Sequence, residues 1–330
     1  ICVDLETGKV IYDKLIYENE SPRFRHPTNS YASCTPAIEA GRVYLHFGSY
    51  GTVCLDTSTG NTIWSRDDFE CDHFRGPGSS PILYGDNLIV AYDGSDKQYV
   101  VALNKETGET AWKTDRNLKY GTENGDWKKA YGTASVFDIK GKPTLIYPSA
   151  KATVAYNPSN GEPMWTVYHD GMNASARPIL TEDGLVILTN GMGRMDAVNP
   201  QGTGDITKTN IDWTIRKNVT RRPSPILVDG NLFMFNDKGI ASCVRAKDGE
   251  ILWQKRIGET FAASPIFDGE HIFAFGEKGQ VFAFQPGDTY QIIGETKLGD
   301  GFKASPAVAG DRLIVRSISK LYCLEGKLRN

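Results

Sequence analysis

Leu103-Asn104-Lys105-Glu106-Thr107-Gly108, followed by Trp112, is the stretch of sequence that decides the fold. It consists of an apolar strand residue, usually Asn or Asp next, a short polar stretch, Gly, three residues and Trp. The same phrase returns at Leu55–Trp64, Tyr156–Trp165 and Val244–Trp253, and a first version with Tyr12 in the Trp position opens the chain. A period of roughly 40–50 residues built from strands and Gly turns indicates an array of blades, in which no unit is stable alone.

Each repeat reads as four short strands. The first begins after small residues that end in Pro, as in Ser79-Ser80-Pro81 and Ala304-Ser305-Pro306. Proline at the first residue of a strand costs no ladder hydrogen bond. The second run is rich in β-branched and aromatic residues, the third carries a small apolar residue, and the fourth carries the Trp. The pattern predicts an all-β chain that forms a closed β-propeller of four-stranded antiparallel blades, as a single domain over residues 1–330.

The two ends of the chain bear on the number of blades. Six complete repeats begin near Ser33, Gly78, Gly132, Ala174, Arg221 and Phe261. The C-terminal repeat, from Phe302, gives three strands, and residues Ile1–Tyr17 give a third and a fourth strand. If both ends shared one blade, its third strand would be supplied twice. The sequence therefore favours eight blades, with the first and last incomplete and roughly 40 residues upstream completing them; the alternative is seven blades.

The repeat assigns most cysteines and tryptophans to packing. The third-strand position that Ala fills elsewhere holds a free Cys, which acts there as a small hydrophobe, at Cys2, Cys54, Cys243 and Cys323. Only Cys34 and Cys71 lie outside this position, and they could pair if their segments meet. A large ring once per blade is typical of packing between blades, and this applies to Trp64, Trp112, Trp165, Trp213 and Trp253. Trp127 is the exception, within an irregular stretch.

Composition excludes some classes of function. A formal net charge of −3, with 23% charged and 40% apolar residues, is that of an ordinary globular protein. It gives no case for a nucleic-acid partner. No apolar run approaches the roughly 18 residues of a membrane-spanning helix, so we expect no transmembrane segment. No spacing of Cys and His suggests a metal site.

The phrase Ala/Cys-Leu-Asp/Asn…Thr-Gly-x-x-x-Trp and the Ser-Ser-Pro strand start resemble the pyrroloquinoline-quinone-like (quinoprotein alcohol dehydrogenase-like) propeller superfamily. Within it, the chain is similar to the bacterial outer-membrane barrel-assembly lipoprotein group. The resemblance covers the whole chain and implies a periplasmic or secreted location; a signal peptide is not observable because the chain starts within a repeat. The dehydrogenases of the superfamily use a quinone beside two adjacent cysteines. No two cysteines are adjacent here, so we expect no cofactor.

Candidate binding residues come from the connections that a propeller gathers at one mouth of its channel. Those from the fourth strand to the next first strand, and from the second to the third, are rich in Arg, Lys, His and aromatic residues. A positive funnel of this kind concentrates anions, and guanidinium groups bind carboxylate, sulfate or phosphate through two hydrogen bonds. The candidates are His26, Tyr31, His73, Arg75, Trp127, Lys129, Tyr131, Arg177, Arg194, Arg222, Lys238 and Lys303.

Two functions fit this pattern. The first is a non-catalytic binding or scaffold propeller of the bacterial cell envelope, whose partner is an anionic small molecule or glycan, a peptide, or an envelope protein. The second is an enzyme that cleaves an acidic polysaccharide by β-elimination. There an Arg would neutralise the carboxylate while a His and a Tyr transfer protons, and His73, Tyr131 and Arg177 or Arg222 are the residue types required. No motif designates a catalytic residue, so the sequence favours the first function.

Overall fold

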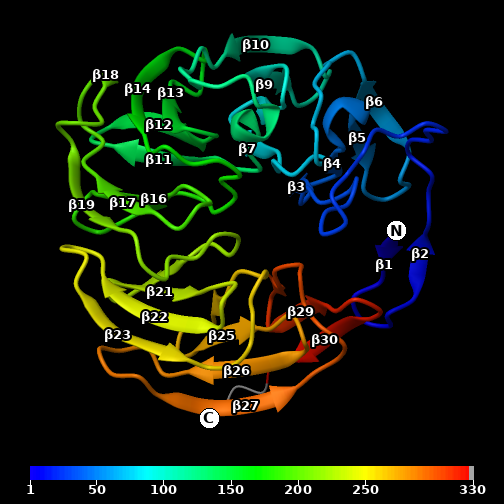
Figure 1. Cartoon of the computed structure of the whole chain (residues 1–330). Coiled ribbons are helices and arrows are strands. Elements are labelled where there is room, and N and C mark those ends of the chain that lie inside the picture. Colours follow the sequence, from blue (N-terminus) through cyan, green and yellow to red (C-terminus); the bar gives the residue numbers. More distant parts are fainter. Residues whose placement is uncertain (327–330) are drawn as a thin grey trace. The chain divides into compact units, whose positions relative to one another are not determined.

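The computed structural model describes residues 1–326, which contain thirty strands and two short 3₁₀ helices. These residues form two compact units, each described here by itself (Figure 1). Unit 1 comprises Ile1–Pro178 together with Gln201–Thr209, and unit 2 comprises Ile179–Pro200 together with the chain from Asn210 onward. In both units neighbouring strands pair antiparallel and in the order of the sequence, except that β18 (Gly204–Asp205) pairs in parallel with β14 (Pro163–Tyr168). Such four-stranded sheets are the blades of a β-propeller, and they confirm the predicted fold class.

Unit 1 holds a two-stranded hairpin and three blades. The hairpin is β1 (Cys2–Val3) and β2 (Val10–Tyr12). The first blade has β3 (Ala37–Glu39), β4 (Arg42–His46), η1 (Gly48–Tyr50), β5 (Thr52–Asp56) and β6 (Thr62–Arg66). The second has β7 (Ile82–Tyr84), β8 (Asn87–Asp93), β9 (Gln98–Asn104) and β10 (Thr110–Asp115), followed by η2 (Gly125–Lys128). The third has β11 (Ser135–Ile139), β12 (Lys142–Pro148), β13 (Ala152–Tyr156) and β14 (Pro163–Tyr168), with β18 (Gly204–Asp205) as a fifth strand.

Unit 2 holds four sheets. The first three have four strands each: β15 (Ile179–Leu180), β16 (Val186–Thr189), β17 (Met195–Val198) and β19 (Ile211–Ile215); β20 (Ile226–Val228), β21 (Asn231–Phe235), β22 (Ile240–Arg245) and β23 (Ile251–Arg256); β24 (Ile266–Phe267), β25 (Ile272–Phe275), β26 (Gln280–Phe284) and β27 (Ile292–Lys297). The last has three strands, β28 (Ala307–Ala309), β29 (Arg312–Arg316) and β30 (Leu321–Glu325).

The number of blades agrees with the seven-bladed alternative, because seven of the described sheets have three or more strands. The preference for eight is corrected by the first repeat, which forms only the hairpin β1–β2 and no blade. The expected third and fourth strands are nevertheless present there, and Tyr12 lies opposite Cys2. The Tyr12 hydroxyl donates to the carbonyl oxygen of Thr57 at 3.3 Å. The hairpin therefore contacts the first blade in the way that the fourth strand of one blade contacts the blade that follows it.

The recurring phrase reflects one contact that is repeated between sheets. Each Trp lies opposite the small third-strand residue: Trp64 opposite Cys54, Trp112 opposite Ala102, Trp165 opposite Ala155, Trp213 opposite Ala197, and Trp253 opposite Cys243. The indole N–H of Trp64 then donates to the Lys105 carbonyl of the following blade at 2.9 Å. Gly108, with a φ of +77°, lies so close to this ring that an added Cβ would be 2.8 Å from it. The packing role predicted for these residues is confirmed.

The small residues before each first-strand proline form a second seam between blades. The Thr35 amide donates to the Ser80 hydroxyl at 2.8 Å, and the Ser80 amide to the Thr133 hydroxyl at 3.1 Å. In unit 2 the amide of Ser224 donates to the Ser264 hydroxyl in the same way. Bulkier residues would separate these backbones, which explains why the sequence keeps Ser, Thr and Ala at this position.

Candidate functional site

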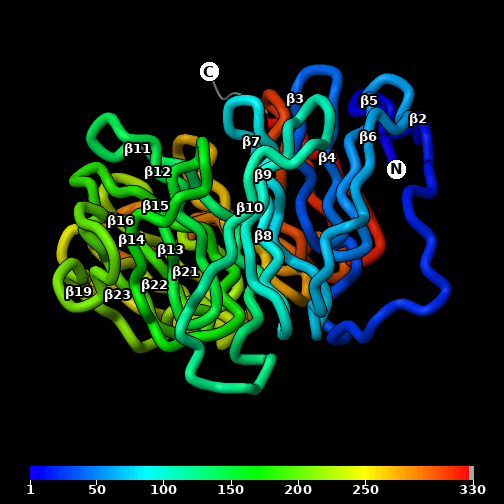
Figure 2. The backbone as a smooth tube through the Cα atoms, turned by 90° about the horizontal axis from the view of Figure 1, so that it is seen from above, coloured from blue at the N-terminus to red at the C-terminus, as the bar shows by residue number. Residues whose placement is uncertain are grey.

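The loop face of unit 1 is where the predicted connections meet. We use this name for the second-to-third turns at 47–51, 94–97 and 149–151 together with the fourth-to-first connections at 67–80, 116–134 and 169–178. The Ser49 amide donates to His73 Nε2 at 3.0 Å, and the Ser95 amide to the Asp72 carbonyl at 2.8 Å. The longest of these connections, between β10 and β11, extends beyond the ends of the strands at the lower edge of Figure 2. Within unit 1, the expectation that both sets share one end is confirmed.

A strap of residues 13–33 runs along the first blade to this face, as the blue tube in Figure 2 shows. Near the start of the strap, the Tyr17 hydroxyl lies 2.6 Å from the Ser65 hydroxyl. At the loop face the Arg23 guanidinium donates to the Cys71 carbonyl at 3.1 Å, and the Asn29 amide group donates to the carbonyls of Arg75 and Pro77 at 2.9 and 3.0 Å. The strap has no repeat pattern, so no signal in the sequence pointed to its path.

Two predicted residues lie on the strap. His26 Nδ1 is 2.7 Å from the Thr28 hydroxyl, and its backbone amide donates to the Arg75 carbonyl. Tyr31 donates to the Arg23 carbonyl at 2.7 Å and packs edge-on against Tyr50. Both side chains are half-buried and hold the strap in place. Their polar groups therefore form hydrogen bonds that stabilise the strap.

His73, Lys129 and Tyr131 are the predicted residues that the structure brings together. Lys129 Nζ lies 3.3 Å from His73 Nδ1 and 4.8 Å from the centre of the Tyr131 ring. Lys129 is only 1% exposed and His73 only 6%. Burial lowers the pKa of Lys129, and burial together with the nearby Lys129 amine lowers the pKa of His73. The sequence predicted that both residues lie in an open funnel. In the structure they are buried beneath the strap and the connections of the loop face.

Cysteines and a second histidine surround this cluster. Cys71 Sγ lies 3.9 Å from His73 Nδ1, and burial raises the pKa of both Cys71 and Cys34 to about 12. All six cysteines are free, so Cys34 and Cys71, which could have paired, are both thiols. His46 is 3% exposed, its Nδ1 lies 2.8 Å from the Thr52 hydroxyl, and burial lowers its pKa to about 3.

Most of the predicted arginines are bound to carboxylates rather than open to a ligand. Arg75 pairs with Asp126 at 2.7 Å in unit 1. In unit 2, Arg194 holds both oxygens of Asp196 at 2.9 and 2.8 Å, and Arg222 contacts both oxygens of Glu277 at 3.3 and 3.2 Å. Asp196 follows Arg194 by two residues, at the start of β17, so that pair carried a local signal; the other acids come from distant loops. The positive charge that these connections leave free for an anion is therefore much smaller than the sequence predicted.

The other candidates lie apart from the buried cluster. Trp127 is half-buried in η2, with Lys151 Nζ 4.7 Å from the ring centre. Arg177 donates to the Ala134 carbonyl at 3.1 Å. Lys238 and Lys303, both in unit 2, have exposed side chains.

A buried ion pair below the same face escaped sequence reasoning. Arg116 and Asp93 form two hydrogen bonds, at 2.6 and 2.8 Å, and both side chains are 0% exposed. The Ser149 hydroxyl also donates to Asp93 at 3.1 Å. The sequence held no signal for this pair, since Arg116 lies 23 residues from Asp93. Its full burial identifies it as a structural element that fixes neighbouring strands.

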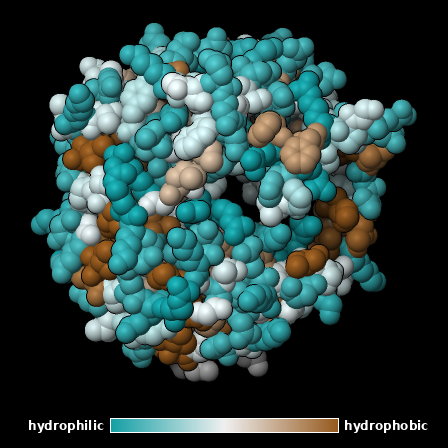
Figure 3. All heavy atoms as spheres, viewed as in Figure 1, coloured by the Kyte–Doolittle hydropathy of each residue, from teal (hydrophilic) through white to brown (hydrophobic). Residues whose placement is uncertain are grey.

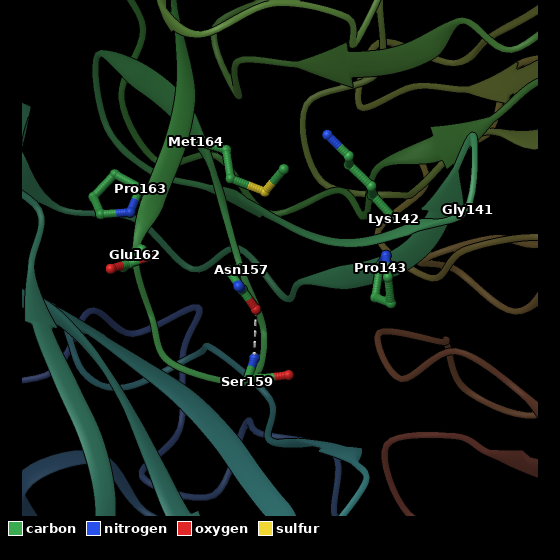
Figure 4. A pocket seen from close by; sticks show the side chains of 8 residues that line it. All are labelled: Gly141, Lys142, Pro143, Asn157, Ser159, Glu162, Pro163 and Met164. Carbon is green, nitrogen blue, oxygen red and sulfur yellow. Dashed lines mark hydrogen bonds between the residues drawn. The ribbon is translucent and has the colours of Figure 1, made fainter.

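The surface of the described residues also holds small hydrophobic areas and a pocket. Hydrophilic side chains predominate on the face drawn in Figure 3, and hydrophobic ones occupy separate small areas. A pocket of about 380 Å³ lies at the turns Gly141–Pro143 and Asn157–Met164. Figure 4 shows Asn157 and Ser159 joined there by the 2.9 Å hydrogen bond of the turn itself. None of the predicted binding residues lines it.

The residues present do not fit the quinone and the metal ion that the dehydrogenases of the superfamily bind. Over residues 1–326, no three His, Cys, Asp or Glu side chains come together in an arrangement that could hold a metal ion. The Trp rings of the repeat are engaged between sheets, with the indole N–H of Trp64, Trp112, Trp213 and Trp253 bonded to backbone carbonyls. No helix in this part of the chain is long and apolar enough to cross a membrane.

Known proteins resemble this chain along most of its length. A family model described as outer membrane protein assembly factor BamB matches residues 96–328. The outer membrane protein assembly factor BamB of Yersinia pestis is 24% identical over 301 residues, which cover 86% of this chain and 72% of that protein. The quinoprotein ethanol dehydrogenase of Pseudomonas putida is 27% identical over 182 residues, which cover 51% of this chain but only 25% of the enzyme.

Solved structures agree on the fold. The crystal structure of BamB from Moraxella catarrhalis superposes with a TM-score of 0.64 at 16% identity, covering 84% of this chain and 79% of that one. At this level of identity the likeness shows the propeller fold alone. The family model, in contrast, matches more than half of this sequence. The chain therefore belongs to the family of the outer membrane protein assembly factor BamB.

Proposed function

We propose that this chain is a non-catalytic scaffold of the bacterial cell envelope, which binds an envelope protein through the loop face of unit 1 during the assembly of outer membrane proteins. The observation that carries the proposal is the family match over residues 96–328. Its location would be the periplasm, in agreement with the location implied by the sequence resemblance. An exposed propeller end built from ordered loops is a common place for such contacts.

The loop face of unit 1 has the properties of a protein-binding surface. The strap and the connections are tied together by hydrogen bonds, so a partner would meet a preorganised surface. Phe74, 39% exposed, offers an apolar anchor, and the Arg75 guanidinium lies 5.6 Å from the centre of its ring. Half-buried Trp127 lies in the neighbouring connection. Aromatic residues and Arg are the residue types enriched at the centres of such interfaces.

A protein partner is favoured over a small anion or an acidic glycan. The guanidinium groups of Arg75, Arg194 and Arg222 already contact carboxylates, which an anionic ligand would have to displace. The lyase alternative gains no support either. The space between His73 and Tyr131 is filled by the buried Lys129 amine, which leaves no room for a sugar between an acid and a base.

Complementation tests the proposed function directly. The chain would be exported to the periplasm of a bacterium that lacks its own outer membrane protein assembly factor BamB, and folded outer membrane porin would be measured by its heat-modifiable migration in gels. We expect the chain to restore part of the porin level. The variant Phe74→Asp should lose this effect, because a charge on the apolar anchor opposes docking.

The matched control is Ile63→Asp, an equivalent change at a 45% exposed apolar residue of β6, outside the loop face. It should restore porin as well as the unchanged chain does. Failure of the well-expressed chain to raise porin, or equal activity of Phe74→Asp and the unchanged chain, would contradict the proposal.

A further inference from the structure

Lys129 is a buried amine without a carboxylate partner in the described chain. Lys129 is 1% exposed, and none of the ion pairs that residues 1–326 form within 4.0 Å involves its Nζ. A charged lysine in such a place would lose its hydration without an ion pair in return. The titratable and charged groups that act on Lys129 and on the adjacent His73 are Arg23, Cys34, His46, Cys71, Asp72 and Asp93, and the Tyr131 ring lies beside the amine.

The hydrogen bonds around His73 fix which groups carry protons. The Ser49 backbone N–H, which can only donate, points to His73 Nε2 at 3.0 Å. Nε2 is therefore the unprotonated nitrogen, and the proton of the neutral ring is on Nδ1. That Nδ1–H faces Lys129 Nζ at 3.3 Å. An ammonium group has no lone pair with which to accept a hydrogen bond, whereas a neutral amine has one. Cys71 Sγ, the other possible acceptor, lies farther from Nδ1, at 3.9 Å, and sulfur accepts only weakly. The geometry therefore favours Lys129 as the uncharged acceptor.

The elements that meet at this cluster are those that close the loop face. Lys129 belongs to the connection between β10 and β11, and His73 to the connection between β6 and β7. The Lys129 carbonyl accepts from the Asn173 amide at 2.9 Å, and the Tyr131 amide donates to the Ala174 carbonyl at 2.8 Å. His46, at the end of β4, is buried in the same region, and its ring lies edge-on to Tyr92. Three connections and the second-to-third turn of the first blade are thus joined around uncharged nitrogen bases.

We infer that Lys129, His73 and His46 form a proton-sensitive latch, which keeps the loop face of unit 1 closed only while all three side chains are uncharged. Proton uptake would turn the His73–Lys129 hydrogen bond into a contact between two donors, and would place positive charge in a buried cluster. Each proton bound by the open form alone shifts the closed-to-open ratio about tenfold per pH unit. The loops therefore open as the pH falls.

Burial gives the same direction for all three groups. The pKa of Lys129, of His73 and of His46 is lowered in each case with desolvation as the main cause. A base with a lowered pKa in the folded state binds more protons when it is released, so closure is favoured at high pH and lost as the pH falls.

The latch is tested by proteolysis of the unchanged chain and of two variants substituted at Lys129. The rate of subtilisin cleavage within residues 116–130 would be measured in the full chain between pH 7 and 9.5 and normalised to an unstructured peptide at each pH. The unchanged chain should be cleaved faster as the pH is lowered, by up to about tenfold per pH unit. Lys129→Met should be resistant with little pH dependence, because it keeps the volume without the amine. Lys129→Arg, which stays charged, should be cleaved rapidly at every pH.

The neighbouring Lys128 provides the matched controls. It pairs with fully exposed Glu123 at 3.2 Å, and Lys128→Met and Lys128→Arg should both behave as the unchanged chain. The latch is wrong if Lys129→Arg is as resistant as Lys129→Met, or if both are cleaved rapidly. It is also wrong if cleavage of the unchanged chain does not depend on pH. This second test uses no variant, so it remains valid if a substitution prevents folding.

Discussion

At the scale of single residues, the repeated phrase describes a contact between two blades. The Trp ring of one blade packs against the turn glycine of the next, and the indole N–H bonds to a carbonyl of that same turn. The glycine is needed for two reasons, since its φ is positive and the ring leaves no room for a Cβ. This double requirement explains why Thr-Gly-x-x-x-Trp was readable from sequence.

A comparison of Gly108→Ala with Gly85→Ala separates the requirement for a positive φ from the requirement for space beside the ring. Gly108 has a φ of +77° and an added Cβ would lie 2.8 Å from the Trp64 ring. We expect Gly108→Ala to lower the free energy of unfolding by about 2–4 kcal/mol, from the strained φ and the clash together. Gly85→Ala, at a φ of +55° in open space, should cost only about 1 kcal/mol. Urea unfolding followed by tryptophan fluorescence checks this; equal losses would show that the ring contact is unimportant.

The buried Arg116–Asp93 pair gives a second prediction at this scale. Replacing Arg116 by Met leaves the Asp93 carboxylate buried without its cation, which should cost about 3–5 kcal/mol of unfolding free energy. Lys97→Met removes a pair with Glu70 in which the side chains are 50% and 81% exposed. That control should cost no more than about 1 kcal/mol. A similar, small loss for both variants in urea unfolding would contradict the structural role given to the buried pair.

At the scale of elements, β18 alters a repeated turn. Four other blades close the third-to-fourth turn with an amide-to-carbonyl bond over five residues, such as Asn104 to Glu109. The corresponding bond here joins Asn199 and Asn210, and the residues between them reach β14, where β18 pairs in parallel. Ile206 is 3% exposed in this position, and its amide donates to the Thr166 carbonyl. The outer edge of β14 is thus covered.

Shortening this turn tests its role as a cover. Residues 200–209 would be replaced by the four residues Lys105–Gly108 of the second blade, so that Asn210 takes the position of Glu109. We expect faster hydrogen exchange at the Tyr168 amide, which now donates to the Thr207 hydroxyl at 2.9 Å, and self-association through the uncovered β14 edge. The Val154 amide, inside the same sheet, serves as the internal reference. A monomeric variant with unchanged exchange at Tyr168 would show that β18 protects nothing.

At the scale of the whole molecule, the stability of unit 1 should depend on pH. Burial lowers the pKa of His46 from an ordinary value near 6.5 to about 3, so the unfolded chain binds a proton there that the folded chain does not. Stability is therefore lost as the pH falls below about 6.5, by about 1.4 kcal/mol per pH unit for this group. Between pH 6.5 and 5 the loss is about 2 kcal/mol. His46→Gln should reduce the difference between urea midpoints at pH 7 and 5; an unchanged difference would contradict the assignment.

The sequence predicted the repeating part of the molecule and missed the part that does not repeat. Strand order, the Trp positions and the small residues opposite them follow from packing contacts that recur in every blade. The strap, β18 and the burial of Lys129 depend on long connections that have no periodicity. A count of basic residues in loops could not reveal that Arg75 and Arg222 contact Asp126 and Glu277, 51 and 55 residues away. The blade number follows the seven-bladed alternative rather than the preferred eight, because the first repeat forms only two short strands.

Site-specific photo-cross-linking in living cells tests the central claim, that the loop face of unit 1 binds an envelope protein. A photoreactive amino acid would replace Phe74 on the loop face and, as a control, exposed Glu106 in the turn between β9 and β10 at the opposite ends of the strands. We predict that Phe74 yields a cross-link to a component of outer membrane protein assembly and that Glu106 does not. Cross-links of equal yield from both positions, or from Glu106 alone, would contradict the account.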